Sequence, residues 1–153
     1  YAFSTEVIVG YSLGKKDLNL FKNIVKNSFI LSSISGLIIS IIFFFTHNLV
    51  INLMSDINEI RELSSSYAVW LIILPVISSF CYQFDGIFIG ASQTKELRNA
   101  MIFSVFSYLL ISILLIKFLF NTGIWISLCI FMILRAVSLF YCLDKIYLRF
   151  RKN

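Results

Sequence analysis

Charged residues divide the chain into long apolar runs. Three uncharged stretches are long enough to cross a bilayer, which needs about 20 apolar residues; they lie between Lys26 and Asp56, between Glu62 and Asp85 (22 residues) and between Arg98 and Lys117 (18 residues). A fourth run follows the turn signal at 121–123 (NTG) and continues to Leu143, with one interruption at Arg135. The pattern predicts complete transmembrane helices at roughly 27–46, 64–91, 99–118 and 123–143, and the end of a fifth at 1–13.

These runs are too long for β-strands, which have about 3–10 residues. In hydrocarbon, only helices and closed barrels satisfy the hydrogen-bonding groups of the backbone. The composition agrees, because 59% of the residues are hydrophobic, 14% are charged and the mean hydropathy is +0.89. A small soluble domain buries only about 60–70% of its chain's surface. We therefore predict an all-α membrane protein, a helical bundle, and exclude a soluble enzyme, a disordered tail and a disulfide-rich secreted module.

The basic residues alternate between the ends of the predicted helices. The segments 14–26, 92–98 and 144–153 carry ten of them, whereas the opposite loops carry only Arg61 and Lys117. Cytoplasmic loops are enriched in Lys and Arg, so these three segments, including the C-terminus, are predicted to be cytoplasmic in a multi-pass protein of the cell (inner or plasma) membrane. The net charge of +5 then reflects topology and contacts with lipid headgroups, and nucleic acid is not expected as a partner.

The loop between the first two complete spans has a helix-start pattern. Asp56 is placed to cap free backbone amides, and Glu59 is placed three residues later to reach back toward the cap. We therefore expect a capping box there. Metal ligands, in contrast, are not expected, because His47 is the single histidine and the three cysteines are widely spaced.

Three ionisable residues interrupt the apolar runs: Glu6, Asp85 and Arg135. Each lies nine or ten residues before the cytoplasmic end of its helix, which is about 13–15 Å inside that boundary. Buried charges in spans are costly and tend to be functional. Two carboxylates and one guanidinium leave one excess negative charge, which would take up a proton or bind a small cation. The alternative is a structural bridge between helices; in either case we predict that Arg135 pairs with Asp85.

Other residues near these charges suggest packing or an accessory polar lining. Gly10 with Gly14, and Gly86 with Gly90, form two GxxxG pairs that let helices approach closely. Pro75 removes an amide donor in mid-span and is expected to kink or loosen its helix. Tyr82 and Gln83 lie beside Asp85 and are candidates for an ion or substrate site.

Several segments resemble the multidrug and toxic compound extrusion (MATE) transporters, in particular their DinF-like branch. The matching segments are VGYSLGKKD at 9–17, FDGIFIGA at 84–91, TKELRNAM at 94–101 and FMILR at 131–135. Members of that family have twelve helices in two six-helix lobes around a central cavity. The resemblance covers residues 1–153 and implies that they form part of the C-terminal lobe, from the end of its second helix onward. The chain also begins with Tyr1 rather than Met, and we expect it to be the C-terminal piece of a longer protein.

The resemblance also implies a function: a secondary active efflux transporter, by antiport of drugs or toxic organic compounds. Asp85 matches a carboxylate that binds the coupling cation in one branch of the family. The coupling ion would be H⁺ or Na⁺, with no other cofactor, and the expected partners are membrane lipids, the missing N-terminal lobe and a small organic substrate. The alternatives are a flippase for lipid-linked oligosaccharides in the same superfamily, which would need a larger and more cationic cavity, and a non-transporting membrane scaffold. An enzyme is not expected, since no Gly-x-Ser-x-Gly elbow or zinc motif occurs.

Overall fold

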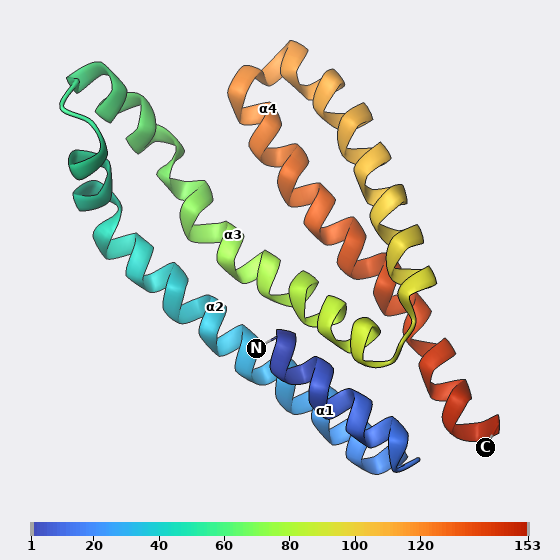
Figure 1. Cartoon of the computed structure of the whole chain (residues 1–153). Helices are drawn as coiled ribbons and strands as arrows, with labels where there is room; N and C mark the ends of the chain where they lie inside the picture. Colours follow the sequence, from blue (N-terminus) through green and yellow to red (C-terminus); the bar gives the residue numbers. More distant parts are fainter. Residues whose placement is uncertain (1, 153) are drawn as a thin grey trace.

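The computed structural model describes residues 2–152, apart from the side chains at 149, 151 and 152. Nearly all of these residues are helical, in α1 (Ala2–Gly14), α2 (Leu18–Met54), α3 (Asn58–Gly90) and α4 (Thr94–Lys152), and no strand occurs among them (Figure 1). The predicted all-α class is therefore confirmed. The helices α2, α3 and α4 are long and apolar enough to cross a membrane.

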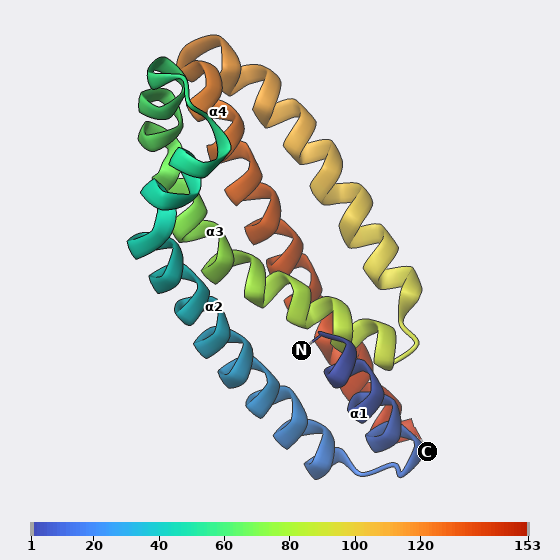
Figure 2. The same cartoon turned by 60° about the vertical axis from the view of Figure 1, so that its left-hand side comes forward.

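The long helix α4 reverses direction at Phe120. This residue has φ 48° and ψ −130°, outside the helical region, and the two parts that it joins lie side by side as antiparallel arms, 94–119 and 121–152 (Figures 1 and 2). A Cβ atom at Gly123 would lie 2.6 Å from the carbonyl oxygen of Leu115, so a glycine is needed where the arms cross. The chain therefore reverses next to the predicted turn, but at Phe120; residues 121–123 are the helical start of the second arm. The four predicted spans fall in α2, α3 and the two arms.

The helices extend beyond the predicted apolar runs into more polar sequence. At its start, α2 is capped by Asp17, whose side chain accepts a hydrogen bond of 2.9 Å from the amide of Leu20. The uncharged run begins only after Lys26, so hydropathy alone sets the start of this helix too late. A side-chain cap satisfies an amide that would otherwise lack a partner, which explains why the helix begins at Leu18.

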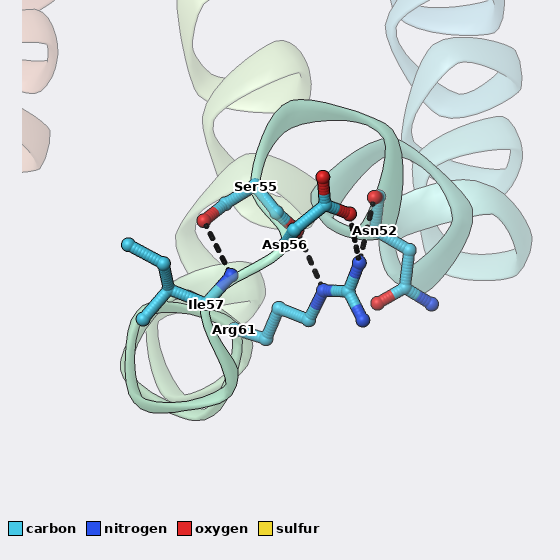
Figure 3. A network of polar contacts seen from close by, with 5 residues as sticks. All are labelled: Asn52, Ser55, Asp56, Ile57 and Arg61. Atoms are coloured by element: carbon cyan, nitrogen blue, oxygen red, sulfur yellow. Dashed lines mark hydrogen bonds and ion pairs between the residues drawn. The ribbon is translucent and has the colours of Figure 1, made fainter.

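The predicted capping box at Asp56 and Glu59 is wrong. The N-cap of α3 is Ile57, which makes no side-chain cap bond, and Asp56 accepts instead from the guanidinium of Arg61 at 3.1 Å. Arg61 also donates to the carbonyl oxygens of Ser55 and Asn52, and the Ser55 hydroxyl accepts from the amide of Ile57 (Figure 3). Arg61 therefore organises this loop, because its fork of donors reaches three acceptors at once.

The basic segments lie together at one end of the bundle. The turn between α1 and α2, the turn between α3 and α4 and the end of α4 are at this end, while the α2–α3 loop and the reversal at Phe120 are at the other (Figures 1 and 2). We call the first the basic end and the second the far end. The hydrophobic core is concentrated in the half nearest the basic end; its members are Val9, Phe21, Ile24, Phe84, Ile87, Phe88, Ala91, Ala100, Leu139, Leu143 and Ile146.

The two turns at the basic end have the same construction. In the first, Lys16 has a φ of 55° and the amides of residues 15, 16 and 17 donate to the carbonyls of residues 11, 13 and 12. In the second turn, Ser92 has a φ of 54°, and the amides of residues 91, 92 and 93 donate to the carbonyls of residues 87, 89 and 88. The second turn thus repeats the first 76 residues later. As a result, α1 and α3 both run toward the basic end.

The helix α1 packs on α3 at Gly86 and Gly90. A Cβ atom at Gly86 would collide with the backbone of Ala2, and one at Gly90 with the backbone of Glu6. This close approach is the packing for which GxxxG pairs are known. In the other pair, Gly10 is in ordinary contact with the carbonyl oxygen of Gly90, whereas nothing in the described part of the chain lies near the Cβ direction of Gly14.

We expect Gly90→Ala to lower the free energy of unfolding by about 1–3 kcal/mol, because the added methyl group must push α1 away from α3. The matched control is Gly14→Ala, where the methyl group meets open space. Thermal unfolding in detergent micelles measures both variants. Equal unfolding midpoints for the two would contradict the close contact between these helices.

Candidate functional site

Two of the three predicted buried charges form an ion pair. Asp85 lies on α3 and Arg135 on the second arm of α4, and the Arg135 Nη2 donates to the Asp85 Oδ2 at 2.8 Å. Their side chains are only 15% and 10% exposed. The pairing that we predicted from their common depth is therefore formed. It joins two helices that also meet nearer the far end, where Trp70 and Trp125 stack with ring centroids 6.4 Å apart.

This ion pair leaves polar atoms on both partners without a hydrogen bond. Among the described residues, neither the Asp85 Oδ1 nor the Arg135 Nε has a partner, and both atoms are buried. A buried polar atom without a partner costs about 1–3 kcal/mol. The Asp85 Oδ1 is consequently a buried acceptor without a donor among the described residues.

A cavity of about 760 Å³ lies beside Asp85, between α1, α2 and α3. Glu6 and Asp85 both line it, so the structure brings all three predicted charges to one region, with Arg135 behind Asp85. Among the described residues, Glu6 has no ion pair. Cavities of about 300–1,000 Å³ hold small organic molecules. Two carboxylates facing one guanidinium leave an excess of one negative charge at the wall of this cavity.

Tyr82 and Gln83 take different positions around the cavity. Tyr82 is half exposed along its wall, whereas Gln83 is 1% exposed. The amide nitrogen of Gln83 donates to the hydroxyl of Thr5 on α1, which in turn donates to Ser28 on α2 at 3.2 Å. This chain of polar side chains ties α1, α2 and α3 together next to Asp85 and Glu6. Gln83 therefore positions the walls of the site.

Pro75 also lines the cavity, where α3 passes closest to α2. A Cβ atom at Gly36 would lie 3.0 Å from the carbonyl oxygen of Pro75. Proline removes the backbone donor that would serve the carbonyl oxygen four residues earlier, at Leu71. At the neighbouring residue, the hydroxyl of Ser40 on α2 donates to the carbonyl oxygen of Ile72. This bond holds α2 against α3.

Sequence reasoning missed the serine hydroxyls and Thr5. Four serines line the cavity and each donates to a carbonyl of its own helix three or four residues earlier; they are Ser32, Ser35, Ser78 and Ser79. Their oxygens add polar character to walls that are otherwise apolar. Their signal in the sequence is the spacing of serines within uncharged runs, at 28, 32 and 35 and again at 78 and 79.

The described residues contain no group of three or more metal-ligating side chains. Cys81 and Cys129 are buried as free thiols, and His47 contacts the carbonyl oxygen of Phe44 at 2.9 Å. The chemistry of the site therefore rests on its two carboxylates, its guanidinium and its hydroxyl and amide groups.

We expect Arg135→Ala to lower the free energy of unfolding by about 3–5 kcal/mol, because it leaves Asp85 buried without its counter-charge. The double variant Asp85→Ala/Arg135→Ala should be less destabilised than the sum of the single variants, by about 1 kcal/mol or more. Chemical unfolding in detergent measures the free energy of unfolding of the wild type, the two single variants and the double variant. A coupling energy near zero would show that the ion pair does not hold the two helices together.

Comparison with known proteins gives a consistent result. The model of the MatE family, the multidrug and toxic compound extrusion proteins, matches residues 1–116. The chain is also similar to the DNA damage-inducible protein F of Escherichia coli (strain K12), with 30% identity over 139 residues. That alignment covers 91% of this chain and 30% of the relative, so the chain spans less than a third of that protein's length. No solved structure gives a significant match. Because the family match extends over most of its residues and the relative resembles almost all of it, this chain belongs to the MATE family of membrane transporters and is DinF-like.

Proposed function

We propose that this chain forms part of the C-terminal lobe of a secondary active efflux transporter, which exports drugs or toxic organic compounds in exchange for H⁺ or Na⁺. The observation that carries the proposal is the hydrogen bonding of the two carboxylate oxygens of Asp85. One of its oxygens accepts a hydrogen bond from Arg135, and the other is buried without a partner among the described residues. Asp85 and Glu6 line the same cavity. This arrangement offers a site for exchange of one positive charge.

The charge balance explains how such a site would couple an ion to a change of conformation. With Asp85 and Glu6 both ionised, Arg135 neutralises only one of them. Uptake of a proton or a small cation removes the excess negative charge, and a cation would also coordinate the free oxygen of Asp85. The packing of α3 against α1 and the second arm of α4 then depends on whether the ion is bound, and a ligand that favours one packing shifts the population toward it.

The cavity itself supports a small organic substrate. Its wall is mostly apolar, with a few serines, Tyr82 and the two carboxylates as polar groups, which is typical of sites for small molecules. No Lys or Arg is among its lining residues. A flippase for anionic lipid-linked oligosaccharides needs a cationic cavity, so the lining favours export of neutral or cationic compounds.

The proposal includes partners and an orientation. The chain would work with a further lobe of the same polypeptide, as part of a twelve-helix protein, and with membrane lipids around it. It would act as a transporter without a cofactor other than the coupling ion, and without nucleic acid. The basic end would face the cytoplasm of a cell whose plasma membrane holds the protein, because ten basic residues lie in the segments at that end.

We expect Asp85→Asn in the intact protein to lower ion-driven transport at least about tenfold, because the amide cannot exchange a positive charge at neutral pH. Efflux of a fluorescent organic cation from proteoliposomes, driven by a pH gradient or by a Na⁺ gradient, measures the effect and identifies the ion. The matched control is Asp56→Asn, which makes the same change at the exposed ion pair of the far end. Wild-type transport by Asp85→Asn would refute the proposal.

The orientation has its own test by cysteine labelling. After replacement of the three native cysteines, a cysteine at position 58 should react with a membrane-impermeant maleimide added outside intact cells. Cysteines at positions 16 and 96 should react only after the cells are opened, because positively charged loops remain in the cytoplasm. External labelling at position 96 would reverse the proposed topology.

A further inference from the structure

A second groove lies on the other side of the bundle, between α2 and the second arm of α4. Its apolar part, with a volume of about 660 Å³, has Phe80 and Phe84 of α3 as its floor. A separate cavity of about 670 Å³ adjoins it toward the basic end, and Tyr147 lines both. Neither cavity contains Asp85 or Glu6, so the groove is distinct from the candidate transport site.

Matching stripes of residues on two antiparallel helices line the two cavities, which share Tyr147. On α2 the stripe consists of Leu18, Lys22, Val25 and Phe29, and on α4 of Leu148, Asp144, Tyr141 and Val137. Residues at these spacings lie on one face of a helix. Each stripe spans twelve residues, about 16 Å along the helix axis. Its charged part lies in the segments predicted to be cytoplasmic, and its apolar part reaches into the predicted spans 27–46 and 123–143.

The apolar part of the groove suits a hydrocarbon chain. The ring of Phe84 contacts the rings of Phe29 and Phe140 there, with centroids 4.8 Å and 6.4 Å apart. Phe140 and Tyr141 are 63% and 76% exposed, so the groove opens outward from the bundle. Apolar cavities do not hold water. In a membrane, the acyl chains of the surrounding lipids are available to fill the apolar part of the groove.

The mouth of the groove carries one charge of each sign. Lys22 on α2 and Asp144 on α4 both line the cavity at the basic end, and both side chains are exposed. None of the ion pairs among the described residues joins Lys22 to Asp144. An ammonium donor and a carboxylate acceptor are thus both present for a ligand. A purely anionic headgroup would meet the carboxylate, whereas a zwitterionic headgroup satisfies both residues.

We propose that this groove binds a phospholipid with a phosphoethanolamine headgroup. Lys22 donates to the phosphate, the primary ammonium of the ligand donates to Asp144, and one acyl chain lies along the aromatic floor. Charge-assisted hydrogen bonds of this kind are the strongest available at such a site. A phosphocholine headgroup has the same charges but no N–H donor, so Asp144 distinguishes the two lipids. The proposal does not rest on the transport mechanism.

The test is a lipid titration of the intact, delipidated protein in detergent, followed by native mass spectrometry. Phosphatidylethanolamine, its N-methyl and N,N-dimethyl derivatives, phosphatidylcholine and phosphatidylglycerol are compared, all with the same acyl chains. We expect phosphatidylethanolamine to bind about tenfold more tightly than phosphatidylcholine or phosphatidylglycerol, which is the effect of one charged hydrogen bond. Because the N-methyl and N,N-dimethyl derivatives each keep an N–H donor for Asp144, the main loss of affinity should come with the third methyl group.

Variants locate the binding site. Asp144→Asn should abolish the preference over phosphatidylcholine and improve binding of phosphatidylglycerol, while Lys22→Gln should weaken all of these phospholipids about tenfold. The matched control is Lys26→Gln, an exposed lysine one turn farther along α2 that does not line the groove. Val137→Trp, which fills the groove, should reduce retention of every lipid. Asp85→Asn should bind lipid like the wild type, which separates this proposal from the transport function.

Three results would overturn the proposal. The first is equal retention of all headgroups by the wild-type protein. The second is a preference for phosphatidylethanolamine that survives both Asp144→Asn and Lys22→Gln. The third is absence of retained lipid in the wild type, which is the result expected if another part of the protein covers the groove.

Discussion

A charged side chain in hydrocarbon requires an opposite charge nearby, and in this chain that requirement joins α3 to the second arm of α4 through Asp85 and Arg135. The arrangement of the site depends on this contact. It holds Asp85 at the wall of the cavity, and it directs one carboxylate oxygen away from the guanidinium. A fully satisfied pair would serve only to hold helices together. The pair here leaves the Asp85 Oδ1 without a partner among the described residues, and the proposed ion coupling rests on that feature.

The sequence predicts the parts of this structure that depend on the membrane alone. Uncharged runs indicate where the helices are, and the distance of each charge from the end of its helix correctly predicts that Asp85 and Arg135 meet. The loop at Asp56 shows the limit of local patterns. A capping box is favoured there by spacing, yet Arg61 binds Asp56 together with two backbone carbonyls, and this competition is visible only in three dimensions.

Contacts between helices that are distant in sequence could not be predicted for the same reason. The hydrogen bond between Gln83 and Thr5 joins residues 78 positions apart, and nothing in either segment identifies the other. The repeated turns at Lys16 and Ser92 offer a physical explanation of how these residues meet. Because both turns lie at the basic end, α1 and α3 run parallel, and Gly86 and Gly90 of α3 lie against the backbone of α1 at Ala2 and Glu6. Gly86 and Gly90 then allow the backbones to touch.

The position of Pro75 has a mechanical consequence. On its basic side, α3 is fixed by backbone contacts with α1 at Gly86 and Gly90 and by the ion pair at Asp85. On its far side, it is held by the stacking of Trp70 on Trp125. Between these anchors, Pro75 removes one backbone hydrogen bond of the helix, so α3 bends most easily there. Both halves of α3 are thus anchored, and the bending that the helix allows is concentrated at the wall of the cavity, which Pro75 lines.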